Sequence, residues 1–295
     1  MDLEKFPSMG REDLRDLKKG IDSGFRDFSR EFGEAIEIFF EPLLWFLVRL
    51  EQLLQATPWP IIIIVVGGLA WLGSRSTKIV VGSVLSFFAI GYFGMWKDTM
   101  STLAIISVST LVCITVGIPT GVMMARSDRA QKVVTPILDI MQTIPAFVYL
   151  IPVVMLLGIG KVPGLIAVCI YAMPPVVRLT NLGIRLVEKE ALEAADAFGA
   201  SSRQRLFGVQ IPLALPNIFA GINQTIMMAL SMVVIASMIG VAGLGVPVLR
   251  SISNQYLALG LMNGLAIVAL AIIFDRVSQE YGSRLQKHRQ GTQHD

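Results

Sequence analysis

The residues best suited to chemistry lie in a short polar segment, residues 188–212, between two strongly apolar stretches. The run EKEALEAADAF is a strong helix former, and Gly199 follows where a left-handed C-terminal cap would lie. Ser201 and Gln204 have the spacing of a capping box that begins a second short helix, and Pro212 marks the entry to the next apolar stretch. We therefore expect a helix–turn–helix that protrudes from the membrane.

The composition of this projection suits docking to another protein. Ala191, Ala195 and Phe198 share one face at helical spacing. The small side chains of Ala194 and Ala195 let a neighbouring backbone approach, and Glu193 offers a charge partner. Because an element of this size cannot bury a core of its own, we expect it to occupy a groove on a partner.

The whole chain is composed for lipid. Of its 295 residues 54% are hydrophobic and 16% are charged, whereas a soluble domain has roughly 25% charged residues. A hydrocarbon core about 30 Å thick requires about 20 apolar residues as helix. We predict an all-α membrane protein with about seven transmembrane helices, at residues 58–74, 79–96, 102–125, 140–160, 163–184, 213–240 and 257–275.

The basic residues predict the orientation of these spans. Cytoplasmic loops carry an excess of Lys and Arg. One arrangement leaves only Lys97, Lys161 and Arg250 in the loops on the outer side, and it places the 188–212 segment and the C-terminus in the cytoplasm. With seven spans the N-terminus is then extracytoplasmic. The loops that this arrangement places inside contain Arg75, Lys78, Arg126, Arg129, Lys132, Arg185, Lys189, Arg203 and Arg205.

The remaining sequence divides around the spans. Residues 1–57 form an N-terminal tail, in which residues 36–50 are predicted to be an amphipathic helix at the membrane surface, because three charged residues interrupt the apolar run. An eighth span there is the alternative and would place the N-terminus inside. Residues 58–96 hold two peripheral transmembrane helices, and residues 281–295 form a cytoplasmic polar tail.

The polar segment resembles the EAA loop, the cytoplasmic signature of ABC-importer permeases. The resemblance lies in Glu193-Ala194-Ala195, Gly199 and Ile211-Pro212; Val209 and Ile211 stand where Ile and Leu are usual. The similarity covers about residues 97–280. Three further stretches look like the glycine betaine/proline betaine/choline branch of these binding-protein-dependent permeases: DIMQTIPAFVYLIPVVMLLGIG (139–160), PPVVRLTNLGIR (174–185) and INQTIMMALSMVVIASMIG (222–240).

The resemblance implies a type I ABC-importer core over residues 97–280, in the bacterial cytoplasmic membrane. The chain would not be an enzyme and would bind no cofactor or nucleic acid. Two partner ATPase subunits would bind ATP and Mg, a second permease copy would complete a homodimer, and an extracytoplasmic binding protein would deliver a methylated amine such as glycine betaine. The coupling helix that docks on the ATPase would contain Glu193, Ala194, Ala195 and Gly199, with Ile211 and Pro212 closing the motif.

Other function classes fit the sequence less well. The chain has no P-loop, since Gly160-Lys161 is followed by Val162. An ion-coupled secondary transporter of a small zwitterion is the main alternative, but such proteins use acidic residues deep in the membrane. Here the charged groups Asp139, Arg178 and Asp275 lie near the cytoplasmic ends of their spans. No Ser/His or paired-Asp constellation suggests a membrane-embedded enzyme.

The solute pathway is marked only by aromatic residues and helix breakers. Phe147, Tyr149 and Tyr171 are candidate lining residues, with core packing as the alternative role. A broken helix survives in lipid where protein or a cavity satisfies its backbone, so the candidate gate residues are Pro145, Pro174 and Pro175. The four tryptophans precede this region and are interpreted as interfacial anchors: Trp45, Trp59, Trp71 and Trp96.

Small residues predict where helices pack closely. Gly117-x-x-x-Gly121 and Gly260-x-x-x-Gly264 allow helices to approach, within one subunit or between two. The two cysteines, Cys113 and Cys169, lie in apolar runs and are interpreted as small buried hydrophobic residues rather than a disulfide or ligands.

Overall fold

A computed structural model describes residues 9–290, with side chains described to residue 282. The secondary structure of this part is helical, which confirms the predicted all-α class. The helices are α1 (Arg11–Ala56), α2 (Trp59–Ser74), α3 (Thr77–Tyr92), α4 (Trp96–Arg126), α5 (Asp128–Thr143), α6 (Ala146–Leu157), α7 (Lys161–Ala172), α8 (Pro174–Arg185), α9 (Lys189–Ala197), α10 (Ser202–Arg205), the π turn η1 (Leu206–Gln210), α11 (Ile211–Ala236), the 3-10 turn η2 (Ser237–Ile239), α12 (Gly245–Asn254) and α13 (Leu257–Gln290).

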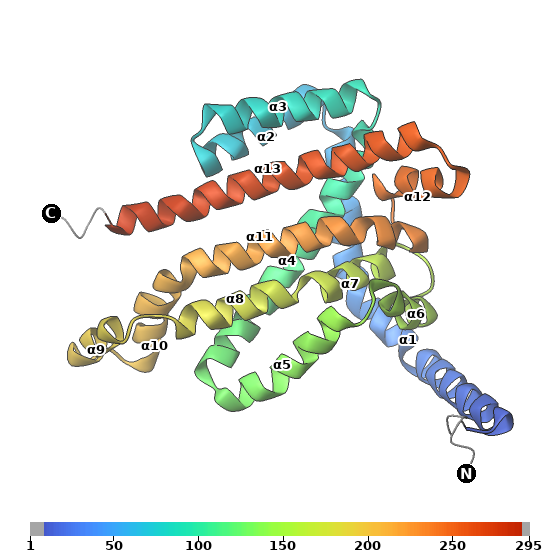
Figure 1. Cartoon of the computed structure of the whole chain (residues 1–295), viewed down its shortest axis with the longest axis horizontal. Coiled ribbons are helices and arrows are strands. Elements are labelled where there is room, and N and C mark those ends of the chain that lie inside the picture. The colour runs from blue at the N-terminus through green and yellow to red at the C-terminus, as the bar shows by residue number, and fades with distance from the viewer. Residues whose placement is uncertain (1–8, 291–295) are drawn as a thin grey trace, which may run out of the picture.

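The long helix α11 lies at the centre and packs against α8, α13, α7 and α4. Figure 1 shows α8, α11 and α13 running side by side, with the α2–α3 hairpin along the outer side of α13. The short helices α9 and α10 protrude at one end of this layer, and α12 lies at the other end. The α9–α10 segment is therefore an outgrowth of the helical body, as the sequence predicts.

Four helical stretches are long and apolar enough to cross a membrane alone: Trp96–Arg126, Lys161–Arg185, Ser202–Ile239 and Leu257–Gly282. Two bent pairs, α1–α2 and α5–α6, bring the number of candidate spans to six if each pair counts as one span. The helix α3 is a shorter apolar helix of 16 residues. Helices thus occupy all seven predicted regions, although three of those regions do not contain a single long helix.

The predicted span 140–160 is divided between two helices rather than formed by one continuous helix. The chain bends by 100° between α5 and α6. Ile144 has extended backbone angles, φ −65° and ψ 128°, because the ring of a following proline disfavours the helical conformation. Pro145 also lacks the N–H that would continue the helix. The break therefore follows from Pro145, which begins the turn before α6.

Both ends of the chain are more helical than predicted. The predicted interfacial helix 36–50 is part of α1, which has 46 residues and bends by 111° into α2. The predicted polar tail 281–295 continues α13 as helix to Gln290, and residues 291–295 lie outside the described part. A bend near a right angle would lay α1 along the membrane surface if α2 crosses it, so the interfacial interpretation stays a prediction.

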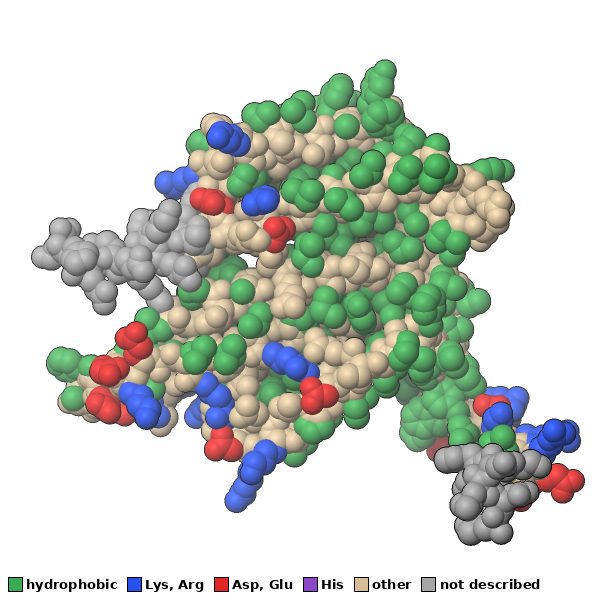
Figure 2. Space-filling model, viewed as in Figure 1, with side chains coloured by type: hydrophobic (Ala, Val, Ile, Leu, Met, Phe, Trp, Pro, Cys, Tyr) green, Lys and Arg blue, Asp and Glu red, His purple; other side chains and the backbone are tan. Residues whose placement is uncertain are grey.

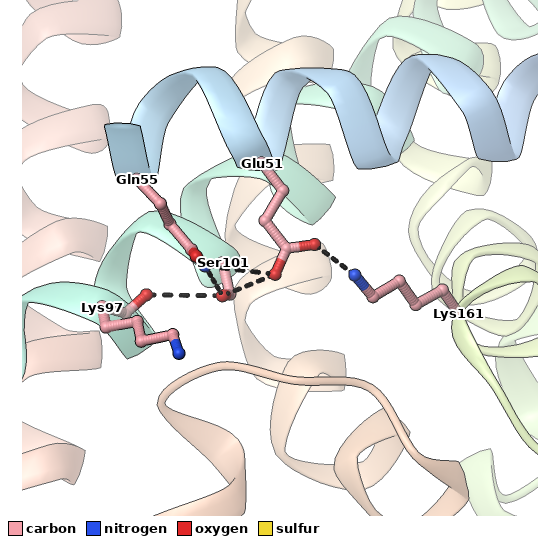
Figure 3. Close-up of polar contacts among 5 residues, drawn as sticks. All are labelled: Glu51, Gln55, Lys97, Ser101 and Lys161. Atoms are coloured by element: carbon pink, nitrogen blue, oxygen red, sulfur yellow. Dashed lines mark hydrogen bonds and ion pairs between the residues drawn. The ribbon is translucent and has the colours of Figure 1, made fainter. Parts of the chain in front are cut away.

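A buried polar network holds α1 against the body of the protein (Figure 3). The Glu51 carboxylate pairs with the Lys161 ammonium of α7 at 2.5 Å, and the Glu51 side chain is only 12% exposed. The hydroxyl of Ser101 on α4 donates to Glu51 Oε1 at 2.8 Å, and Gln55 Nε2 donates to Ser101 Oγ at 2.9 Å. One carboxylate thus joins three helices, and Leu47 beside it is fully buried.

Glycines set the closest helix contacts of the core. A Cβ at Gly117 would lie 2.6 Å from Val176 of α8, and one at Gly121 would lie 2.7 Å from the carbonyl oxygen of Val177. The first glycine motif therefore packs α4 on α8 inside the subunit. In the second motif a Cβ at Gly260 would meet Ser251 of α12, whereas Gly264 faces open space. Cys113 and Cys169 are buried free thiols, as predicted.

Candidate functional site

The projection predicted from residues 188–212 is present. Helix α9 ends at Ala197, and Gly199 has a left-handed conformation with φ +76°. The N–H of Ala200 donates to the carbonyl of Ala195, and the N–H of Gly199 donates to that of Asp196, both at 3.0 Å. These two bonds form a Schellman cap, so the predicted left-handed cap at Gly199 is confirmed.

The second half of the projection also begins as predicted. The Ser201 hydroxyl accepts from the N–H of Gln204 at 3.4 Å, and the Gln204 side chain accepts from the N–H of Ser201 at 2.9 Å. This capping box starts α10, which runs through η1 into α11 without a break in the helical backbone. Ile211 and Pro212 are the first residues of α11 and are half-buried.

An ion pair that the sequence analysis did not identify closes the projection. Arg205 Nη1 of α10 lies 2.8 Å from Asp196 Oδ2 of α9. Leu206, the next residue, is buried beneath the projection. This ion pair could have been predicted from the sequence, because Asp196 and Arg205 have opposite charges and lie nine residues apart on the two sides of the predicted turn. Together with the two caps, this ion pair holds α9 and α10 in one arrangement.

The outer surface of the projection is apolar at its tip. Glu193 and Ala194 are exposed on α9, while Ala195 is half-buried. Phe198 is 92% exposed. Phe198 is the C-cap residue that follows α9, and its predicted place on the same face as Ala191 and Ala195 stays a prediction. Such an exposed aromatic side chain beside a charged one is suited to insertion into a partner.

The base of the projection is fastened to three spans. Arg185, at the end of α8, donates through Nη2 to the carbonyl of Met124 at 2.9 Å and to Asp128 Oδ1 at 2.7 Å. Its Nε donates to Asn181 Oδ1 at 3.1 Å. The sequence analysis counted Arg185 only as a basic residue, although the i, i+4 spacing to Asn181 was visible. These bonds tie the helix that leads into α9 to the end of α4 and the start of α5.

The same helix end packs closely on α11. A Cβ at Gly183 would lie 2.7 Å from Asn217 Cβ and 3.2 Å from the carbonyl oxygen of Ala214. The two chain segments that enter and leave the projection, α8 and α11, are therefore in direct contact. A displacement of the projection would be passed to both helices together, because close-packed interiors transmit strain.

The candidate pathway residues differ in their exposure and surroundings, and their role in a pathway stays a prediction. Phe147 is 54% exposed, whereas Tyr149 is buried and its hydroxyl donates to the backbone carbonyls of Met141 and Ile140 in α5. Tyr171 is half-buried against the core. Pro145 lies in the α5–α6 break, and the buried Pro174 and Pro175 begin α8. Tyr149 thus links α6 to α5 across the break between them. Among the described residues, no group of three or more His, Cys, Asp or Glu could hold a metal ion.

This fold and its projection belong to a membrane permease. Residues 117–286 match the family described as "Binding-protein-dependent transport system inner membrane component". That match covers more than half of the chain, so the chain belongs to this family and is a multi-pass inner-membrane transport protein. The family consists of transport permeases rather than enzymes.

Several relatives have names that state which solute they transport. The chain is 51% identical over 241 residues to the glycine betaine/proline betaine transport system permease protein ProW of Escherichia coli strain K12, covering 82% of this chain and 68% of that protein. It is 46% identical to the glycine betaine/carnitine transport permease protein GbuB of Listeria monocytogenes, covering 77% and 81%. Among solved structures, a chain of the MetNI methionine ABC transporter shares the fold, with a TM-score of 0.57 at 20% identity, over 63% of this chain and 93% of that one.

Proposed function

We propose that this chain is the permease subunit of an ATP-driven importer and that the projection at residues 188–212 receives force from a partner ATPase. The supporting observation is the rigid projection, which is capped at Gly199, closed by Asp196–Arg205 and exposes Phe198 at its tip. In the proposed complex two ATPase subunits bind ATP and Mg, and Glu193, Ala194, Ala195 and Phe198 lie in a groove of one of them.

The transported solute in this proposal is a quaternary or methylated amine, such as glycine betaine, proline betaine, choline, carnitine or trimethylamine N-oxide. Two relatives at 51% and 46% identity are named for the transport of glycine betaine together with proline betaine or carnitine. An extracytoplasmic binding protein captures the solute and delivers it to the permease, as the family description implies. Uptake of such a compatible solute would serve osmoprotection.

Alternating access follows from how the projection is attached. When the ATPases close on ATP, the docked projection moves with them, and the contacts of Arg185 and Gly183 carry the displacement into α4, α5, α8 and α11. A second permease copy completes the conduit as a homodimer. This arrangement requires the projection to lie in the cytoplasm; in the proposed topology of seven spans the C-terminus lies there too and the N-terminus lies outside.

Ion-coupled secondary transport is not favoured. The family match argues against it, and two acidic groups near the span ends, Asp139 and Asp275, bond to side chains of neighbouring helices. Asp139 of α5 pairs with Arg178 of α8 at 2.5 Å. Asp275 of α13 accepts from Asn223 of α11 at 2.8 Å and from Gln279 at 2.6 Å. Their positions suit helix packing better than repeated binding and release of an ion.

Reconstitution of the permease with its ATPase and binding protein in liposomes tests this function. Labelled glycine betaine is expected to accumulate only with ATP, and Phe198→Ala is expected to reduce uptake at least tenfold, since loss of an interface anchor costs about 2 kcal/mol or more. Phe39→Ala is the matched control, because Phe39 is also a highly exposed phenylalanine, at 76%, and lies in α1, outside the projection. Accumulation driven by an ion gradient without the ATPase would refute the proposal.

A further inference from the structure

A cavity of about 490 Å³ lies where the end of α1, the start of α2, the end of α3 and the start of α4 meet. Its walls contain Trp59, Phe87, Phe88, Tyr92 and Trp96, and Gln55 adds a polar side chain. We call this the aromatic pocket. It lies outside residues 117–286, which match the transport family, so it is separate from the shared core.

The aromatic content of this pocket is far above that of the chain. Five of its eleven lining residues are Phe, Tyr or Trp, whereas aromatic residues make up 8% of the sequence. A neighbouring cavity of about 310 Å³ shares Phe87 but is lined mostly by aliphatic side chains. Aromatic residues are thus more frequent in this pocket than in the neighbouring cavity, although ring pairs also occur elsewhere, at Phe28–Phe32 and Phe219–Tyr281. Of the four predicted interfacial tryptophans, only Trp59 and Trp96 line it.

The rings form walls at steep angles to one another. Trp59 and Phe88 have ring centroids 6.5 Å apart and planes at 69°, and Phe87 and Trp96 have centroids 6.3 Å apart and planes at 77°. Gly91 brings the Trp96 ring close to α3, since a Cβ there would lie 3.3 Å from Trp96 Cε3. Each pair is edge-to-face, so one ring of the pair directs its edge at the face of the other, and the ring faces outside these pairs can line the cavity.

Gln55 is held in place by the network that fastens α1 (Figure 3). Its Nε2 donates to Ser101 Oγ at 2.9 Å and to Glu51 Oε1 at 3.3 Å. The remaining polar atom of this side chain is the amide oxygen, the negative end of its dipole. The described residues that line the pocket include no charged side chain, and the nearby Glu51 is already paired with Lys161. A bound cation would therefore be held by ring faces and an amide oxygen.

We propose that the aromatic pocket binds a trimethylammonium group. Aromatic cages recognise quaternary ammonium ions because ring faces attract the cation without requiring a hydrogen bond from it. The volume is in the range of small-ligand sites. The ligand is either a free methylated amine or the headgroup of a choline lipid, both of which present the same group. The proposal rests on the ring chemistry of the pocket and not on which solute the permease transports.

Binding of labelled choline to the full chain in nanodiscs of phosphatidylethanolamine and phosphatidylglycerol tests the site. We expect choline to bind and its neutral isostere 3,3-dimethylbutan-1-ol to compete at least tenfold more weakly. Trp59→Leu and Tyr92→Leu are each expected to weaken choline binding about two- to fivefold, the effect of one exposed cation–π contact, because the two side chains are 56% and 79% exposed. Trp71→Leu is the matched control, because Trp71 is 46% exposed on the same helix as Trp59 and does not line the pocket.

A second arm separates the two sources of the ligand. The permease is purified from membranes with equal phosphatidylcholine and phosphatidylethanolamine, and its retained lipids are measured by mass spectrometry. Phosphatidylcholine enrichment that Trp59→Leu abolishes, without binding of free choline, supports the pocket with a lipid as ligand. Equal competition by the neutral isostere, unchanged binding in the pocket variants, or the absence of both choline binding and lipid selectivity would overturn the proposal. Glycine betaine uptake is measured in parallel. If uptake fails while choline still binds, the proposed transport function is refuted and the proposed pocket is not.

Discussion

At the scale of single residues, Gly199 is the position where backbone conformation is most clearly required. Its φ of +76° is rarely adopted by residues with a Cβ, and nothing lies within 4 Å of the place where that Cβ would be. A substitution there therefore acts through the backbone alone. Gly199→Val is expected to destabilise the turn by about 1–3 kcal/mol and to abolish ATP-driven uptake, while protein remains in the membrane.

The control for this prediction is Gly208→Val. Gly208 lies in η1, nine residues further along the same projection, and also has open space around its Cβ position, but its φ is not in the left-handed region. Uptake and ATPase activity of both variants are measured in proteoliposomes at matched protein content. Normal uptake by the Gly199 variant, or equal loss in both variants, would show that the left-handed turn is not what coupling depends on.

Some of the residue-scale geometry could be predicted from sequence because it is local. The cap at Gly199 and the capping box of Ser201 and Gln204 depend on neighbours within five residues, and both predictions are confirmed. The contacts of Arg185 with Met124 and Asp128 join residues about 60 positions apart. Their partners depend on the packing of α8 on α4, which no single-segment pattern encodes, so the sequence analysis missed them.

At the scale of elements, the close packing of α4 on α8 contributes to the stability of the helical core. Gly121→Leu would place a side chain against the backbone of α8, where a Cβ already lies 2.7 Å from the Val177 carbonyl oxygen. Overpacking of this kind typically costs about 1–3 kcal/mol. We expect a lower midpoint of thermal unfolding for the detergent-purified chain, whereas Gly264→Leu, which meets nothing within 4 Å, leaves the midpoint unchanged. Equal midpoints for the two variants would contradict this packing role.

The existence of the helices was easier to predict than their continuity. The apolar run at residues 140–160 predicts a span by hydropathy, but the local effect of Pro145 on Ile144 breaks it into α5 and α6. The aromatic pocket could not be predicted from single helices either. Trp59 and Trp96 begin two different helices, and only the meeting of α2, α3 and α4 brings their rings into one cavity.

At the scale of the whole molecule, the charge distribution bears on its orientation in the membrane. On the face shown in Figure 2, charged side chains gather around the α9–α10 projection and at the start of α1, while hydrophobic side chains cover much of the helices between them. The helix α1 is not among the four stretches that could cross a membrane alone. Its 46 residues would extend about 69 Å at 1.5 Å per residue, more than twice the thickness of the hydrocarbon core.

These features lead to a prediction about which side of the membrane each end of the body faces. Ser23 of α1 and Ser202 of α10 are both exposed, and the native Cys113 and Cys169 are buried and give little background labelling. Ser23→Cys is expected to react with a membrane-impermeant thiol reagent in spheroplasts, because the proposed topology places α1 on the extracytoplasmic surface. Ser202→Cys is expected to react only after permeabilisation, because in the proposed complex the projection faces the ATPase. Protection of residue 23 in spheroplasts would favour an eighth span within residues 1–57, and labelling of residue 202 in spheroplasts would reverse the orientation and remove the coupling role of the projection.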